Sequence, residues 1–242
     1  MELTQTNSAY RLMQDADNDG IYKIKILECS FVACFVEISS KLMLDIGNVL
    51  QKHNSVYKFK KWVIDRKNVA KGDFSFSFTD MFQNRCPEEV LVCITSSEAQ
   101  FGHLQKNALE LKHCKLNFLD FTYADESFPG RPLQMQFAKP DEPSIGTLYT
   151  EAYYRLFLRK TEHARIGISL EDFSGGFSVF FFDLTPELDS TKNIVSSLPK
   201  SGVCKLEGTF SAAAEEALTI YIIGIFQSQF EITQSRAIIY KG

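Results

Sequence analysis

The chain has 242 residues, of which 45% are hydrophobic, 23% charged and 13% aromatic, and its formal net charge is −4. An ordinary apolar fraction with a small net charge excludes global disorder, and a pI near 5.7 argues against a general nucleic-acid binder. Apolar runs are all much shorter than the roughly 18 residues of a membrane span. Residues Met1–Tyr10 carry neither a basic nor an apolar region, so we expect no secretory signal.

Strand patterns follow one another along most of the chain. The first covers Tyr22–Ile38, whose opening residues alternate between apolar and lysine side chains. Asp73–Phe82 has the clearest period of two, with a phenylalanine at every second position from Phe74 to Phe78, which predicts one buried and one solvated face. The remaining predicted strands are Lys58–Ile64, Glu89–Thr95, Leu109–Tyr123, Leu133–Phe137, Phe177–Leu184, Val203–Phe210, Leu218–Ile232 and Ala237–Tyr240.

One segment has the spacing of a helix instead. Leu148, Ala152 and Leu156 recur every four residues and form an apolar stripe, which is typical of an amphipathic helix. Ser211–Leu218 is rich in alanine and glutamate, and we expect a short helix or a loop there, because two turns of helix are marginal alone. Phe128–Gly130 has the composition of a turn.

Eight to ten strands with uneven loops and one inserted helix predict an all-β fold, an antiparallel jelly-roll sandwich. We expect residues 1–20 to form an N-terminal arm and residues 21–242 to form a single jelly-roll domain. Phe177–Leu184 and Leu218–Phe226 are apolar at nearly every position, whereas a strand with one solvated face alternates. The second face of these strands is therefore expected to be covered, either by the inserted helix or by another subunit.

The cysteines show no metal-binding pattern. Their spacings match neither C-x-x-C nor any paired zinc motif. Most lie in apolar strand-like runs such as Ser30–Phe35, where cysteine behaves as a small buried hydrophobe. We therefore expect reduced thiols at all six positions, which are Cys29, Cys34, Cys86, Cys93, Cys114 and Cys204.

An acidic segment near the N-terminus resembles part of a calcium loop. Asp15, Asp17, Asp19 and Gly20 reproduce the opening of an EF-hand, in which three oxygen side chains and a glycine turn surround the ion. The twelfth position of such a loop is a bidentate glutamate, but here it is Ile26. A solvated acidic turn is the favoured interpretation and a weak cation site the alternative. We expect no metal and no other cofactor.

No catalytic motif is present. His113 and Cys114 are adjacent, but neighbouring residues of the predicted strand point to opposite faces, so we expect a structural histidine and no nucleophile. His53, His103 and His163 lack the spacing of a helical metal pair. The paired acids lie in polar, turn-like segments. We therefore expect no catalytic residue and no enzymatic activity.

A basic stretch, Lys58–Trp62, interleaves lysines with aromatic residues and is followed by Arg66, Lys67 and Lys71. Such a stretch could contact phosphate groups or stack on a nucleobase. A strand with one charged face explains it equally well and is the favoured interpretation. We expect no specific nucleic-acid site.

Asp183–Pro186 has the composition of a strand end. The proline ends the hydrogen-bond ladder, and the side chain of Asp183 or Thr185 can bond the freed backbone amides. These residues are expected to determine the fold and not to catalyse a reaction.

Several strings in the second half of the chain occur in an order that is more specific than any one of them: Lys106–Asn117 with Arg131–Gln134, the helix Tyr149–Phe157, Gly176–Leu188, and the last two strands, Leu218–Phe230 and Arg236–Tyr240. Across residues 89–242 their order and spacing resemble those of the capsid proteins of Polinton/Maverick elements and adintovirus-like viruses, whereas residues 1–88 match more loosely. The resemblance implies a jelly-roll capsid protein, hexon-like or penton-like with a single jelly roll. Hexon-like members carry two jelly rolls in a longer chain, and this chain has room for one. The alternatives are therefore a single-roll relative, a penton-like minor protein and the C-terminal half of a hexon-like protein.

The leading hypothesis is a structural viral or virus-derived capsid protein that self-assembles into capsomers of a double-stranded DNA virus-like particle. The alternative is a β-sandwich binding module that recognises a carbohydrate or protein ligand. The capsid hypothesis implies a location in the virion, after synthesis and passage through the host nucleus or cytoplasm. Its expected partners are further copies of the chain, as a trimer by preference and a pentamer next, together with other capsid proteins, and we expect no insertion into a membrane.

Overall fold

The structure is a computed structural model that describes residues 12–13, 20, 22–79, 81–137, 148–157, 167–185 and 202–241. These residues form nine strands, three α-helices and one 3-10 helix. In chain order they are α2 (Ser40–Lys52), β1 (Ser55–Val69), β2 (Ser75–Phe78), η1 (Met81–Asn84), β3 (Glu89–Ser96), β4 (Leu116–Tyr123), β5 (Glu126–Gln134), α3 (Leu148–Phe157), α4 (Leu170–Gly175), β6 (Val179–Asp183), β7 (Cys204–Phe210), β8 (Leu218–Ile232) and β9 (Ile238–Lys241).

The strands form two sheets with the topology of a jelly roll. One sheet has the order β1-β8-β3-β6, with β9 added to β8, and the other has the order β2-β7-β4-β5. The pairing is nested: β4 lies beside β5, β3 beside β6, β2 beside β7 and β1 beside β8, as in a long hairpin that has been rolled up. The pairs β2–β7, β3–β6, β3–β8, β4–β5, β4–β7 and β8–β9 are antiparallel. The predicted all-β jelly-roll sandwich is thereby confirmed.

The chain divides into two compact units. We call residues 1–22 and 62–226 the jelly-roll unit, and residues 23–61 and 227–242 the arm unit. The boundary between the units falls inside β1 and inside β8. The predicted division into an arm of residues 1–20 and one domain of residues 21–242 stays a prediction.

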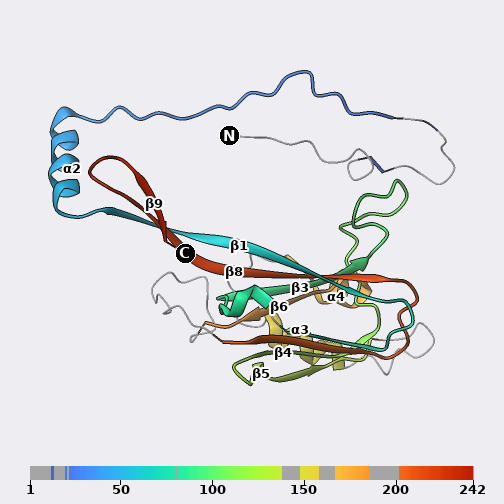
Figure 1. The fold of residues 1–242 in the computed structure, drawn as a ribbon. Coiled ribbons are helices and arrows are strands. Elements are labelled where there is room, and N and C mark those ends of the chain that lie inside the picture. The colour runs from blue at the N-terminus through green and yellow to red at the C-terminus, as the bar shows by residue number, and fades with distance from the viewer. Residues whose placement is uncertain are drawn as a thin grey trace. The chain divides into compact units, whose positions relative to one another are not determined.

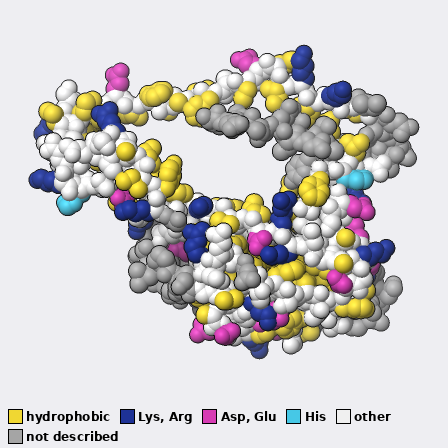
Figure 2. Space-filling view, viewed as in Figure 1, with side chains coloured by type: hydrophobic (Ala, Val, Ile, Leu, Met, Phe, Trp, Pro, Cys, Tyr) yellow, Lys and Arg dark blue, Asp and Glu magenta, His cyan; other side chains and the backbone are white. Residues whose placement is uncertain are grey.

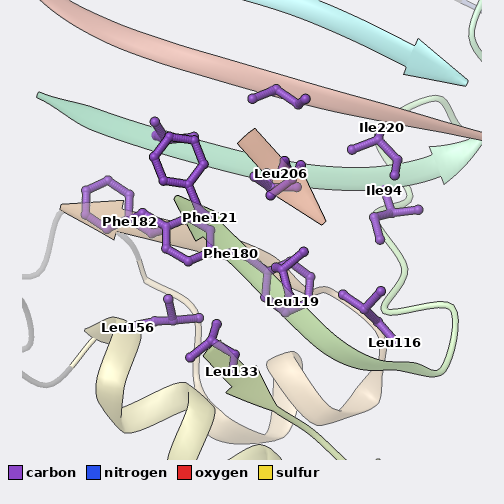
Figure 3. Packing of buried hydrophobic residues seen from close by; sticks show 14 of the residues in the cluster. Ile94, Leu116, Leu119, Phe121, Leu133, Leu156, Phe180, Phe182, Leu206 and Ile220 are labelled. Atoms are coloured by element: carbon purple, nitrogen blue, oxygen red, sulfur yellow. The ribbon is translucent and has the colours of Figure 1, made fainter. Parts of the chain in front are cut away.

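The jelly-roll unit has an aromatic core between its sheets. Phe121 of β4 stacks on Phe182 of β6 with their ring centroids 5.6 Å apart, and both side chains are buried. Phe173 of α4 meets Phe180 of β6 edge to face at 5.7 Å. Figure 3 shows Phe121, Phe180 and Phe182 together between the strands, with Leu156 of α3 nearby. The Phe121–Phe182 pair joins residues that are far apart in the sequence and lie in different sheets, so this core holds the rolled hairpin closed.

The predicted inserted helix is α3, and it closes the roll beside β5 and β6. It packs against β5, β6 and α4, and its buried side chains are Ala152, Tyr153, Leu156 and Phe157. The guanidinium group of Arg155 donates hydrogen bonds to the carbonyl oxygens of Pro129 and Pro132, both at 3.1 Å. These two hydrogen bonds to the backbone of β5 anchor the helix to the sheet.

The predicted strand Tyr22–Ile38 is wrong. The whole segment is exposed and has no regular secondary structure, and Figure 1 shows it as a trace with neither coil nor arrow. Apolar content favours a strand only where a neighbouring strand accepts its backbone hydrogen bonds. No strand of the described residues pairs with this segment.

Further strand boundaries differ from the prediction. The predicted strand Leu133–Phe137 contains only the last two residues of β5, and the predicted strand Asp73–Phe82 is reduced to β2, Ser75–Phe78. The strand expected over Leu109–Tyr123 begins only at Leu116, because the backbone turns at Cys114 and Lys115, whose φ angles are +48° and +57°. The predicted turn Phe128–Gly130 lies inside β5, next to a register shift against β4. The actual turn between β4 and β5 is Ala124–Asp125, where both φ angles are positive, as a two-residue hairpin requires.

Two helices lie outside the prediction, and both carry capping residues. The Ser39 side chain accepts a hydrogen bond from the amide of Leu42 at the start of α2. Ser169 and Asp172 form a reciprocal capping box at the start of α4. Ser211–Leu218, expected as a short helix or a loop, contains no helix. Among the described residues, no helix combines the length and the apolar character needed to cross a bilayer.

The core makes a direct prediction for stability. Replacing Phe121 with alanine removes a buried ring and leaves a cavity between the sheets, so we expect a loss of about 3–5 kcal/mol in the free energy of unfolding. The matched control is Phe74→Ala, because the Phe74 side chain is 62% exposed even though the alternation predicts it to be buried. Denaturant titration of both variants measures the difference. An equal loss in the two variants would contradict the described core.

Candidate functional site

Part of the predicted chemistry lies outside the described residues. Of the acidic segment only Gly20 is described, so Asp15, Asp17 and Asp19 remain untested, as does His163. Within the described residues, no group of three or more His, Cys, Asp or Glu side chains is arranged to hold a metal ion.

His113 and Cys114 lie in a turn and not in a strand, which corrects the premise of their prediction. The His113 ring stacks on Phe137, with centroids 3.9 Å apart and planes 6° apart. Its Nδ1 atom accepts a hydrogen bond from the backbone amide of Lys115 at 2.9 Å. Burial and the nearby charge of Lys115 lower the pKa of His113 to about 4. The imidazole is therefore a neutral acceptor that holds the turn, as a structural histidine does.

The cysteines fall into two groups. Burial raises the pKa of Cys114 to about 11, and it raises the pKa of Cys93 and Cys204 to about 12, so these three remain protonated thiols near neutral pH. Cys29 and Cys34 are exposed, so the expectation that residues 30–35 form a buried run is wrong. All six cysteines are described, and none forms a disulfide.

A cavity of about 450 Å³ lies at one end of the roll, lined by residues 110–115, 175–177, 213–216 and Leu218. Ion pairs occupy its rim: Lys115 lies 2.6 Å from Glu215, and Lys106 lies 3.2 Å from Glu216. Ser96 also donates a hydrogen bond of 2.7 Å to Glu216. The bond from Ser96 lowers the pKa of Glu216, and the bond from Lys115 lowers the pKa of Glu215.

These shifts decide what the cavity can do chemically. Near neutral pH the Glu215 and Glu216 carboxylates are ionised and already paired, the His113 imidazole is neutral and the Cys114 thiol is protonated. General acid–base or nucleophilic catalysis needs a group whose pKa lies near the working pH, and the shifts move these groups away from it. The apolar part of the lining, which includes Leu111, Phe177 and Ala213, can receive an apolar side chain.

The expected strand end at Asp183 is confirmed. The Asp183 Oδ1 atom accepts a hydrogen bond of 3.0 Å from the Thr185 amide and one of 2.6 Å from the Thr185 hydroxyl. The aspartate therefore satisfies backbone at the end of β6, which is a role in the fold.

The basic stretch Lys58–Trp62 lies in β1, as its favoured interpretation predicts. Lys67 pairs with Asp65 at 3.4 Å. Lys58 and Lys61 are exposed, and no ion pair of the described residues involves them. Two unpaired cations therefore lie on the part of β1 that belongs to the arm unit.

The arm unit has almost no core of its own. All of it is described except Gly242, and not one of its apolar side chains is buried; only Ser228 and Glu231 are. Phe35 is 91% exposed and Phe31 77%. Helix α2 has an apolar stripe but buries no residue. Figure 2 shows hydrophobic side chains along α2 and along the segment that precedes it.

Polar and ring contacts hold only the stranded part of the arm unit together. Glu231 accepts a hydrogen bond of 2.9 Å from Asn54 and pairs with Lys241 at 2.5 Å. Tyr57 stacks on Phe230 with ring centroids 5.0 Å apart. The hydrogen bond from Lys241 lowers the pKa of Glu231. These contacts order the ends of β1, β8 and β9 and leave the apolar surface of α2 uncovered. The sequence prediction missed this surface, although the cap at Ser39 and the apolar spacing of α2 were signals for it.

Comparison with known proteins identifies no family. Neither a family model nor a curated protein matches the sequence. Among solved structures, the chain is similar to the Sputnik virophage at 9% identity and a TM-score of 0.47, with 78% of this chain and 39% of that chain covered. It is similar to the mavirus major capsid protein at 12% identity and a TM-score of 0.39, with 78% and 41% covered. The match thus spans about two fifths of either relative, and values this low identify no relationship.

The buried imidazole makes stability depend on pH. The pKa of His113 is about 4 in the folded chain, against an ordinary value of 6.5, so the unfolded chain binds the proton more readily. The free energy that the neutral imidazole contributes to stability is fully present above pH 6.5 and is lost as the pH falls from 6.5 to about 4. His113→Asn keeps an acceptor for the Lys115 amide but does not titrate. We expect the wild type to lose more free energy of unfolding than this variant from about pH 7 to about pH 5, measured by denaturant titration. Equal losses would contradict the assignment of a buried neutral imidazole.

Thiol labelling tests the two groups of cysteines. Exposed thiols react faster than buried thiols of raised pKa, so a maleimide should modify Cys29 and Cys34 first. Peptide mass mapping over time gives the order of modification, and labelling in denaturant is the control for intrinsic reactivity. Selective early labelling of Cys114 would revive a nucleophilic role for that residue.

Proposed function

We propose that this chain is a structural capsid protein of a double-stranded DNA virus or virus-derived element, related to the capsid proteins of Polinton/Maverick elements and adintovirus-like viruses. Its function is to assemble with copies of itself, and with other capsid proteins, into capsomers. A trimer is the preferred state and a pentamer the next. The protein acts in the virion, after passing through the host nucleus or cytoplasm, and it catalyses no reaction.

The observation that carries this proposal is the arm unit without a core. Fixing the conformation of a residue costs roughly 1–2 kcal/mol in conformational entropy, and apolar burial is the main term that offsets it. The described apolar side chains of the arm unit form no core within that unit. A partner molecule that covers them would supply the missing burial, since large exposed apolar surfaces mark interfaces. A protein whose function is assembly needs such a surface.

Two further observations support a capsid protein. The order and spacing of the strings over residues 89–242 resemble those of the capsid family. The rolled topology of the two sheets, β1-β8-β3-β6 with β9 added to β8 and β2-β7-β4-β5, is a fold that capsid proteins use. Because the same fold serves other functions, the topology alone does not select this one.

The second candidate function is a ligand-binding β-sandwich, and the cavity at the end of the roll favours it. A volume of about 450 Å³ is within the range of small-molecule sites. The rim charges are already paired with one another, however, so few polar groups remain to orient a ligand. This candidate does not explain the exposed apolar surface of the arm unit.

Native mass spectrometry and light scattering test the proposal. We expect a concentration-dependent symmetric oligomer across micromolar concentrations, and we expect particles by electron microscopy when partner capsid proteins are present. Calibrated monomeric jelly-roll proteins serve as controls for non-specific association. A strictly monomeric chain that joins no particle with its partners would contradict the capsid function and favour the binding module.

A further inference from the structure

The two units carry opposite charge. The arm unit has nine Lys and Arg residues against four Asp and Glu, a net charge of +5. The jelly-roll unit has 17 against 26, a net charge of −9. Two arm units therefore repel each other, whereas an arm unit and a jelly-roll unit attract.

From this asymmetry we propose that the arm unit of one copy docks on the jelly-roll unit of a second copy. The proposal rests on the capsid function above and names the two units that meet. The exposed apolar side chains of residues 23–39 and of α2 supply the buried area, and the opposite net charges select the pair of surfaces.

The symmetry of the assembly follows from this pairing. A contact between two different surfaces is heterologous, and repetition of it closes into a ring when the rotation allows. A contact between two copies of one surface gives a two-fold dimer instead. The charge asymmetry therefore favours a ring, such as a trimer or a pentamer, over a dimer joined arm to arm.

The chain is long enough to make such a contact. Residues 23–39 can span about 55 Å when fully extended, at roughly 3.3 Å per residue. A compact unit of 187 residues, the size of the jelly-roll unit, has a radius of gyration of roughly 16 Å and is about 40 Å across. The segment can therefore extend beyond the width of one jelly-roll unit and reach a neighbouring copy.

A protein surface fits the arm unit better than a nucleic acid does. Phosphate groups would pair with lysines such as Lys58 and Lys61, but they would leave the apolar side chains of the arm in water. Those side chains are numerous: Ile26, Leu27, Phe31, Val32, Phe35, Val36, Leu44 and Val49 are each more than half exposed. Covering them requires apolar side chains on the partner, and the acidic jelly-roll unit exposes several, among them Trp62, Ile64 and Phe101.

Cross-linking from the native thiols of the arm tests the pairing directly. Cys29 and Cys34 are exposed, whereas the other four cysteines are buried or half-buried, so a photoreactive maleimide at limiting concentration marks the arm. The full-length chain is prepared in natural and in ¹⁵N-labelled form, mixed, cross-linked and digested. We expect cross-links from the arm of one isotopic form to peptides of residues 62–226 of the other. Cross-links confined to one isotopic form, or joining arm to arm, would overturn the proposal.

Charge reversal gives an independent readout. Lys58→Glu with Lys61→Glu lowers the charge of the arm unit, and we expect it to weaken association roughly tenfold or more at low ionic strength, with the difference shrinking as salt is added. Lys58→Arg with Lys61→Arg keeps the charge and is the matched control. Equal association of the two variants would overturn the charge selection. If instead a double-stranded DNA fragment bound the wild type with the same lysine dependence while the copies stayed apart, the occupant would be nucleic acid and the proposal would fail.

The two levels of inference fail separately. Oligomers whose cross-links run from arm to arm would leave the capsid function standing and remove this pairing. A chain that stays monomeric under every condition, with its partners present, would remove the capsid function itself.

Discussion

The contact on which the rest of this structure depends is the aromatic packing between the two sheets. Phe121 of β4 and Phe182 of β6 belong to opposite sheets, and their stacked rings fill the space between them. β4 pairs with β7 and β6 pairs with β3, each a strand distant in the sequence, so the rings stabilise contacts of long sequence separation. Helix α3 can dock beside β5 and β6 because this packing brings both strands to the same end of the core.

Ion pairs and hydrogen bonds at the end of the roll add local order without creating reactive chemistry. Each strongly shifted side chain is moved away from a reactive state: the pKa of His113 falls, the pKa of Cys114 rises, and Glu215 is held ionised by Lys115. Catalytic sites shift pKa values toward the working pH instead. The described polar groups around the cavity thus stabilise the turn before β4.

The two units differ in whether they have a buried apolar core. The jelly-roll unit has a buried core that includes Phe121 and Phe182, whereas the arm unit buries no apolar side chain and exposes Phe35 and Val36. The same residue types are thus buried in one unit and exposed in the other. The proposed assembly follows from this difference, since apolar burial that is missing within one chain is available between chains.

The sequence by itself determined the strands that have a local signature. The predicted strand Leu218–Ile232 coincides with β8, Glu89–Thr95 lies within β3 and Val203–Phe210 contains β7, because apolar runs and alternation report the faces of a strand directly. The helix around Ala152 and the hydrogen-bonded strand end at Asp183 were likewise predictable from spacing and side-chain chemistry. The sequence also predicted the jelly-roll class, to which the nested pairing of these strands belongs.

Only the tertiary structure decided which apolar segments are covered. Ser30–Phe35 is as apolar as β6, yet the first is exposed and the second is buried. Local pattern cannot separate the two, because a strand exists only where a partner accepts its hydrogen bonds, and that partner is distant in the sequence. The same limit applies to the turn at Cys114 and Lys115, whose positive φ angles accompany a His113 ring stacked on the distant Phe137. The sequence shows the chemistry of each side chain, but whether a side chain is buried depends on how the whole chain folds.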